Sequence, residues 1–142
     1  MVQAQQDFAQ TIDTRPSKVL FDTLPINEGE YILTHAAIGI PTGGSGLYDC
    51  SYVVNANIQG SGTVGGNLTA FIMHADSSGA AVPVPESMSY VAINSNSPNA
   101  TLHVNCQRVL NDGDTLKVFV GYVGTGTAST IPNQSILTLH RL

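Results

Sequence analysis

The feature that most constrains the fold of this chain is the segment from Asn99 to Tyr122, where two alternating runs flank a polar turn. Apolar residues occupy every second position of both runs, at Ala100, Leu102, Val104 and Cys106 in the first and at Leu116, Val118, Val120 and Tyr122 in the second. This period of two is that of a half-buried β-strand. The turn contains Asp112-Gly113, a pair that supplies the positive φ angles of a tight connection. The sequence therefore predicts an antiparallel hairpin and an all-β fold.

Further strands are predicted at residues 18–24, 30–38, 48–58, 67–75, 87–94 and 134–142. The segment 48–58 holds the longest alternation and is predicted to be central in its sheet. No segment has a helical period. About eight short strands with Gly- and Pro-rich connections predict an antiparallel two-sheet sandwich of the jelly-roll type. The absence of Trp disfavours an immunoglobulin-like sandwich, and the long connections disfavour an up-and-down barrel.

Length and composition predict one domain with an unusual surface. The chain has 142 residues, and a domain of this size buries roughly two-thirds of its unfolded surface. Charged residues make up only 11% of the chain, less than half of their usual share. The surface is therefore expected to be polar but nearly uncharged. Because such a surface loses little hydration when another protein covers it, we expect extensive subunit contact.

Charge and hydropathy argue against two classes of partner. The formal net charge is −5 and the five basic residues are scattered, so no positive stripe is available for nucleic acid. No apolar run is long enough to cross a membrane, and the first residues lack the basic start and apolar stretch of a signal peptide. We expect synthesis in a cytosol, with neither nucleic acid nor a membrane as partner.

Residues 1–16 are predicted to form an N-terminal arm, separate from a jelly-roll domain at 17–142. The arm is rich in Gln, Asp and Thr, and its few apolar anchors make too small a face for a packed helix. We expect it to lie extended and to contact a capsid through Phe8, Ile12 and Arg15, with a disordered terminus as the alternative. Removal of residues 1–15 would then leave the domain folded.

No cluster in the sequence predicts a catalytic, cofactor or metal site. The four histidines, His35, His74, His103 and His140, lie on separate predicted strands without a partner at metal-ligand spacing. On a threefold axis, three copies of His103 or His140 could still bind an ion. The segment 60–65 matches the glycine pattern of dinucleotide-binding loops, but a predicted strand follows it where that site needs a helix. The protein is therefore predicted not to be an enzyme and to need no cofactor.

Two other sets of residues have both a structural and a ligand-binding interpretation. Asn111, Asp112 and Asp114 offer oxygen ligands for calcium, but the turn itself explains them and the full calcium-loop spacing is missing. Cys50 and Cys106 fall on the apolar sides of their strands. They are predicted to be buried free thiols, with a disulfide or a metal site as the alternative. No resident metal is predicted.

Three short motifs in residues 18–142 carry a family resemblance. They are Gly46-Leu47-Tyr48 at the start of the long strand, Leu110-Asn111-Asp112-Gly113-Asp114-Thr115-Leu116 before the penultimate strand, and Ser135-Ile136-Leu137 in a last strand that stops at the C-terminus. In these motifs the chain resembles the C1q and tumour-necrosis-factor (TNF) class of trimeric jelly rolls. The resemblance implies the jelly-roll fold and a threefold assembly about aromatic and aliphatic faces.

A low-charge jelly roll with an arm and no secretion signal is similar in architecture to small virion proteins of bacteriophages and other viruses. By this analogy we expect a non-enzymatic, homotrimeric capsid decoration or cementing protein, located in the virion after synthesis in the host cytoplasm. Its partners would be itself and a capsid or other virion protein. The alternative is a spike or fibre head that binds a glycan or protein receptor, although the predicted loops lack the aromatic platforms that sugars use.

Two predicted strands carry apolar residues on both faces and predict where the copies meet. Phe71 and Met73 lie opposite the core side of one strand, and Phe119 and Val123 lie opposite the core side of another. One sandwich cannot bury both faces, and burying such an aromatic side chain contributes about 2 kcal/mol. The predicted trimer interface comprises Phe71, Met73, Phe119, Val123 and Leu142.

Overall fold

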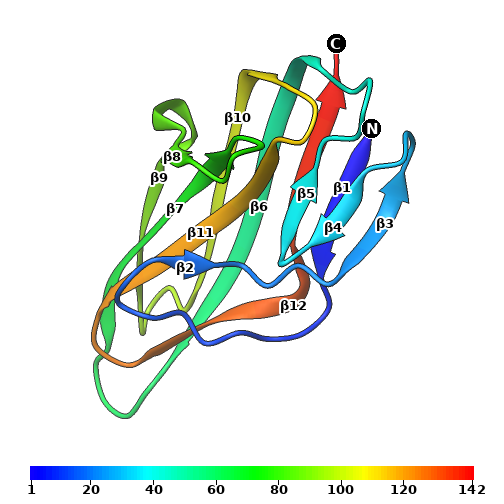
Figure 1. Cartoon of the computed structure of the whole chain (residues 1–142). Helices are drawn as coiled ribbons and strands as arrows, with labels where there is room; N and C mark the ends of the chain where they lie inside the picture. The colour runs from blue at the N-terminus through cyan, green and yellow to red at the C-terminus, as the bar shows by residue number, and fades with distance from the viewer.

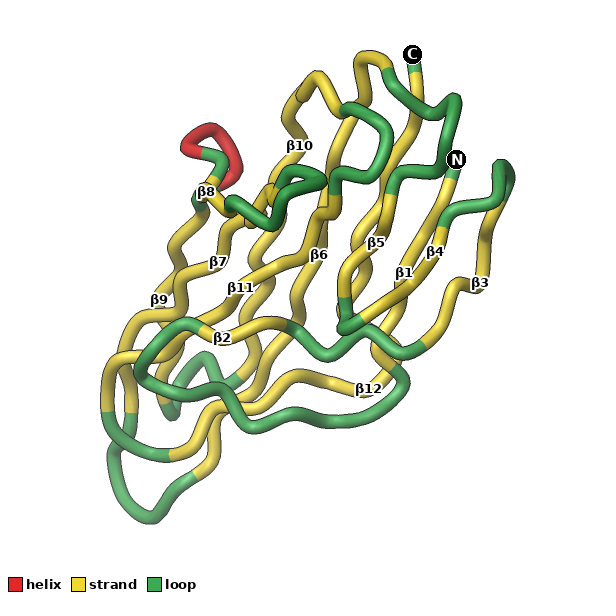
Figure 2. Tube along the Cα trace, in the orientation of Figure 1, coloured by secondary structure: helices red, strands yellow, loops and turns green.

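The computed structural model describes residues 1–142 as two antiparallel sheets packed face to face (Figure 1). The strands are β1 (Val2–Gln6), β2 (Ser17–Lys18), β3 (Thr23–Asn27), β4 (Ile32–Thr34), β5 (Ala37–Gly39), β6 (Gly46–Gln59), β7 (Gly65–Ala75), β8 (Ala81–Pro83), β9 (Ser89–Asn94), β10 (Asn99–Leu110), β11 (Thr115–Gly124) and β12 (Thr127–Arg141). A single turn of 3-10 helix, η1 (Pro85–Ser87), lies beside β8 (Figure 2). The predicted antiparallel two-sheet sandwich is confirmed. The structure contains no helix with the length and hydropathy that a membrane-spanning helix requires.

The structure has twelve strands rather than the expected eight or so. Residues 18–24 and 30–38 break into four short strands, and β1 and β8 are additional. The break within 30–38 is a hairpin turn at His35 and Ala36, which both adopt positive φ (52° and 64°). Tight hairpin turns of this type usually contain Asn or Gly. The sequence therefore carries no local signal for this turn.

One sheet has the strand order β10-β6-β12-β1-β3, and the other runs β4-β5-β11-β7-β8, with β2 on β11 and β9 on β7. The predicted hairpin is therefore wrong in its pairing, although both of its strands exist. β10 pairs with β6, and β11 pairs with β7 in the opposite sheet. Backbone hydrogen bonds tie the connecting turn to Ile40, which accepts from Gly113 N and donates to Asp114 O. The turn thus carries the chain from one sheet to the other.

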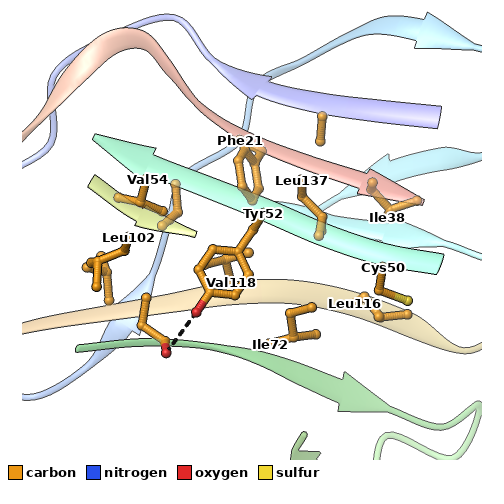
Figure 3. Close-up of a cluster of buried hydrophobic side chains, with 14 of the residues drawn as sticks. Phe21, Ile38, Cys50, Tyr52, Val54, Ile72, Leu102, Leu116, Val118 and Leu137 are labelled. Atoms are coloured by element: carbon orange, nitrogen blue, oxygen red, sulfur yellow. Dashed lines mark hydrogen bonds between the residues drawn. The ribbon is translucent and has the colours of Figure 1, made fainter. Parts of the chain in front are cut away.

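β6 is central, as its alternation predicted. It pairs with β10 on one side and with β12 on the other. Its even-numbered residues from Tyr48 to Ile58 are buried in the core. Figure 3 shows Cys50, Tyr52 and Val54 of this row beside side chains of the opposite sheet. Tyr52 reaches across the core, and its hydroxyl lies 2.6 Å from the Ser87 carbonyl and 2.6 Å from the Ser89 hydroxyl.

The N-terminal segment is part of the sandwich, in contrast to the predicted separate arm. β1 pairs with β12 on one side and β3 on the other. Val2, Ala4 and Gln6 are fully buried. The sequence did not show an apolar alternation here because the third inward position is the polar Gln6. Its side-chain amide N–H donates to Gln10 Oε1 at 2.7 Å, and its Oε1 accepts from the Thr130 hydroxyl at 2.7 Å. A buried amide is tolerated when its hydrogen bonds are made.

The loop after β1 runs along one end of the molecule before reaching β2 (Figure 2). Backbone hydrogen bonds hold it to β12 and β11, from Ile12 N to Ala128 O at 2.8 Å and from Tyr122 N to Asp13 O at 2.9 Å. The two chain termini lie close together at the opposite end (Figure 1). Residues 1–16 therefore contribute one strand and one closing loop to the domain.

Candidate interaction surfaces

The outer surface of the five-stranded sheet is polar but almost free of charge. Along β6, β10, β12 and β1, the positions that alternate with buried residues point away from the core. We call this set the polar face; it comprises Gln3, Gln5, Asp49, Ser51, Val53, Asn55, Asn57, Thr101, His103, Asn105, Gln107, Ile136, Thr138 and His140. Asp49 is its only carboxylate, and it contains no Lys or Arg. A partner could therefore cover this face with little desolvation of charge.

Two apolar groups interrupt the polar face. In its centre, Val53 lies opposite His103 on one neighbouring strand and Ile136 on the other. At one end, Leu47, Val109 and Leu142 are exposed next to one another, since Val109 pairs with Leu47 and Leu142 N donates to Leu47 O at 2.8 Å. Leu142 belongs to the predicted interface, whereas Leu47 and Val109 were not singled out from the sequence. Their common position depends on the pairing of strands that are distant along the chain.

A second surface, on the outside of the seven-stranded sheet, is built around stacked aromatic rings. Phe71 and Phe119 lie opposite each other in β7 and β11, with ring centroids 5.6 Å apart and planes inclined by 27°. We call this surface the aromatic face; it comprises Lys18, Thr69, Phe71, Met73, Met88, Tyr90, Lys117 and Phe119. The prediction that β7 and β11 carry apolar side chains on the side away from the core therefore agrees with the structure.

The five residues of the predicted trimer interface do not form one surface. Phe71, Met73 and Phe119 belong to the aromatic face, and Val123 is exposed farther along β11. Leu142 lies at the end of the polar face, on the other sheet. A single flat contact therefore cannot use all five residues.

The residues predicted to contact a capsid also differ in exposure. Phe8 is 40% exposed, and Arg15 is exposed as well. Ile12 is buried in the core cluster. Only Phe8 and Arg15 are therefore available to a partner, and both lie on the closing loop rather than on a projecting arm.

A partly buried polar cluster that sequence analysis did not detect joins β7, β10 and the turn after β10. Nε2 of His74 lies 2.8 Å from Oδ2 of Asp114, and Nε of Arg108 donates to Nδ1 of His74 at 3.1 Å. Since Arg can only donate, Nδ1 is the acceptor and the proton of the neutral imidazole is on Nε2, which donates to Asp114. Asp114 also accepts from Asn111 N at 2.9 Å. The cluster links the two sheets, and no nucleophile hydrogen-bonds to it.

The acidic turn uses its carboxylates to hold loops rather than to form a cation site. Asp112 accepts hydrogen bonds from Gly43 N, Ser45 N and the Ser45 hydroxyl, at 2.9, 2.9 and 2.7 Å. The carboxylate of Asp114 points instead toward His74. No three His, Cys, Asp or Glu side chains come together as a metal-ligating group.

The Asp112 contacts predict a pH-dependent stability. The Gly43 amide, followed by the Ser45 hydroxyl and amide, holds the pKa of Asp112 below its ordinary value of 3.8. The ionised Asp112 carboxylate therefore stabilises the folded state fully at pH values above its pKa in the unfolded chain. This stabilisation is lost as the pH falls through the pKa of Asp112 in the folded chain. We expect Asp112→Asn to unfold at lower denaturant concentration than the wild type at neutral pH, and the difference to shrink toward pH 2.

Asp13→Asn is the matched control, because it removes the same charge from an exposed side chain without removing any side-chain hydrogen bond. Urea unfolding monitored by circular dichroism at several pH values would measure both variants. A constant difference between Asp112→Asn and the wild type at every pH would contradict the expected linkage.

Cys50 and Cys106 lie directly opposite each other in the β6–β10 pair, and both are free thiols. Cys50 is buried, and burial raises its pKa to about 12. Cys106 is half-buried. The expected position of both on the core side is confirmed.

A pocket of about 310 Å³ lies beside the two chain termini. Glu28, Tyr31 and Arg141 are among its lining residues. The Arg141 guanidinium is already engaged by the carbonyls of Gly43 and Ser45, at 3.1 and 2.7 Å. The N-terminal amine lies 3.4 Å from Glu28. The charged groups of this pocket are therefore occupied by contacts within the chain.

No protein-family model and no curated protein matches the sequence. Solved structures do match: the crystal structure of murine APRIL at pH 5.0 has a TM-score of 0.65 and 12% identity, with full coverage of both chains. The structure of Eiger TNF from S. frugiperda has a TM-score of 0.68 and 13% identity, covering 99% of this chain and 90% of that one. At such identity the likeness concerns the fold alone. The chain therefore has a TNF-like jelly-roll fold, as its short motifs implied.

Proposed function

We propose that this chain is a non-enzymatic structural protein that assembles as a homotrimer and decorates a virus capsid. The observation that carries the self-association is the polar face, which extends over four neighbouring strands with one carboxylate and no Lys or Arg. Amides and hydroxyls lose less hydration than charged groups when they are covered. Val53 and Ile136 supply apolar contact at the centre of this face.

The polar face is better suited to self-association than the aromatic face. A copy that covered Phe71 and Phe119 would also have to cover Lys18 and Lys117, and burying unpaired ammonium groups is costly. We therefore place the trimer contact on the polar face and its Leu142 end, rather than at Phe119. The resemblance to trimeric jelly rolls and the TNF-like fold support a threefold arrangement.

The oligomer is tested by charge substitutions in the centre of the polar face. We expect the wild type to sediment as three chains of 14.9 kDa, about 45 kDa together, and Val53→Asp and Ile136→Asp to sediment as folded monomers. These side chains point away from the core, so far-ultraviolet circular dichroism should stay unchanged. Analytical ultracentrifugation at micromolar concentration would decide.

Tyr90→Asp, on the exposed part of the aromatic face, is the matched control and should remain trimeric. A trimeric Val53→Asp variant would refute the assignment of the interface to the polar face. A monomeric Tyr90→Asp variant would instead favour the interface around Phe119.

The capsid role rests on the low charge of the whole surface and on the exposed Phe8 and Arg15 of the closing loop. Three copies of a weak contact attach a trimer far more firmly than one copy. Immunogold labelling of assembled particles tests the role. An even coat would support decoration, whereas labelling confined to vertices or a tail tip would favour a receptor-binding spike, and unlabelled particles would exclude both.

A further inference from the structure

The seven-stranded sheet has an uneven charge distribution. Its strands β2, β4, β5, β7, β8, β9 and β11 contain no Asp or Glu, although the chain has ten acidic residues and a net charge of −5. Lys18 and Lys117 both lie on these strands. The strands of this sheet therefore carry two positive side chains and no negative ones, on a protein that is acidic as a whole.

The two lysines flank the stacked aromatic rings. Lys18 lies directly opposite Phe119, and Phe119 lies directly opposite Phe71. Lys117 is two positions from Phe119 on the same strand and opposite Met73. Residues opposite each other in a sheet project to the same side with Cβ atoms roughly 5 Å apart. The ammonium groups and the two rings therefore share one surface.

Exposed side chains extend this surface across β9. Tyr90, which is opposite Thr69, is 69% exposed, and Met88 is 40% exposed. The Tyr90 hydroxyl lies 4.0 Å from Met88 Sδ, so these two side chains are neighbours. Tyrosine, methionine and phenylalanine are residue types enriched at protein–protein contacts.

We propose that the aromatic face is a docking surface for an acidic segment of another protein. The segment would lay an aromatic or long aliphatic side chain on the Phe71–Phe119 pair and bring carboxylates to Lys18 and Lys117. Two cations are too few for stable phosphate-backbone binding, and the net charge of the chain opposes an anionic bilayer. A second copy would present two more lysines if it used the same face. The proposal goes beyond the proposed function and needs neither the trimer nor the capsid.

Selection from a random peptide library on the full-length protein tests the proposal without assuming a partner. We expect the enriched peptides to combine Asp or Glu with an aromatic or long aliphatic residue. With ¹³C-methyl methionine labelling, the best peptide should shift the signals of Met73 and Met88. The Met1 signal should stay unchanged, because that residue lies beside Glu28 at the chain termini.

Two variants show which side chains of the aromatic face bind the peptide, and a control variant carries the same number of added carboxylates elsewhere. The double variant Lys18→Glu/Lys117→Glu and the single variant Phe119→Ala should each weaken peptide binding about tenfold or more, since charge pairs and central aromatic residues dominate such contacts. Ser61→Glu/Thr63→Glu adds carboxylates in the exposed β6–β7 loop and should bind the peptide like the wild type.

Several outcomes would overturn the proposal. These are the absence of enriched peptides, enrichment of basic peptides, or equal binding by the Lys18→Glu/Lys117→Glu variant. Binding to phosphatidylserine vesicles that this variant loses would assign the surface to a membrane instead. Trimeric Val53→Asp and Ile136→Asp variants would leave this result unaffected. A monomeric Tyr90→Asp variant would instead mean that a second copy covers the aromatic face, and it would overturn the proposal as well.

Discussion

Deletion of residues 1–15 is expected to leave a chain that does not fold. The deletion removes β1 from between β12 and β3, and with it the buried Val2, Ala4 and Gln6. It also removes Ile12, whose amide is bonded to Ala128 O. The lost pairing and burial are comparable with the whole stability of a domain of this size, about 5–15 kcal/mol. Near-ultraviolet circular dichroism and a cooperative thermal transition should both be absent.

A substitution on the adjoining loop separates this effect from a role of the segment in binding. Phe8 is exposed, so Phe8→Ser should change the free energy of unfolding by only about 0.5 kcal/mol or less. If the chain without residues 1–15 instead unfolded cooperatively with a native near-ultraviolet spectrum, the segment would be the separable arm that its composition predicted.

Tyr52→Phe is expected to lower the free energy of unfolding by about 2 kcal/mol, because it leaves buried polar groups without partners. The Tyr52 hydroxyl lies 2.6 Å from the Ser87 carbonyl, 2.6 Å from the Ser89 hydroxyl and 3.0 Å from the Ala70 carbonyl. It has one proton to donate, so it donates to a carbonyl and accepts from Ser89. Burial raises its pKa to about 12, and the proton therefore stays in place at neutral pH. Urea unfolding would measure the loss.

Two comparisons test whether the cost comes from these hydrogen bonds. Tyr90→Phe removes a hydroxyl from an exposed ring and should change stability little. The double variant Tyr52→Phe/Ser89→Ala should lose less than the sum of the single variants, because both remove one shared contact. A Tyr52→Phe variant as stable as the wild type would show that water satisfies the freed groups.

Positions of strands and their inward faces were predictable from local pattern. Residues 48–58, 100–107 and 115–122 alternate as strands, and their predicted core sides are the sides that face the interior. The reason is geometric: side chains of a strand alternate between two faces, so one buried face imposes a period of two. The apolar outer sides of β7 and β11 followed from the same pattern.

The buried face of β1 was the exception among these local signals. Its inward positions hold Val2, Ala4 and Gln6, which are too small or too polar to mark a core strand. The burial of Gln6 depends on the Gln10 amide and the Thr130 hydroxyl, which complete its hydrogen bonds. Residue 130 is far away along the chain, so the local composition of residues 1–16 could not reveal this partner.

Pairing and the composition of the surfaces depended on contacts between distant segments. An Asp-Gly turn between two alternating runs fits a hairpin, yet β10 and β11 belong to different sheets because β6 and β7 pair with them instead. Both arrangements bury the same side chains, so the pattern alone cannot distinguish them. The pattern alone also could not show that two members of the predicted interface, Phe119 and Leu142, lie on different sheets. Alternation specifies which side of a strand faces the core, whereas the neighbours of that side are set by which strands pair across the fold.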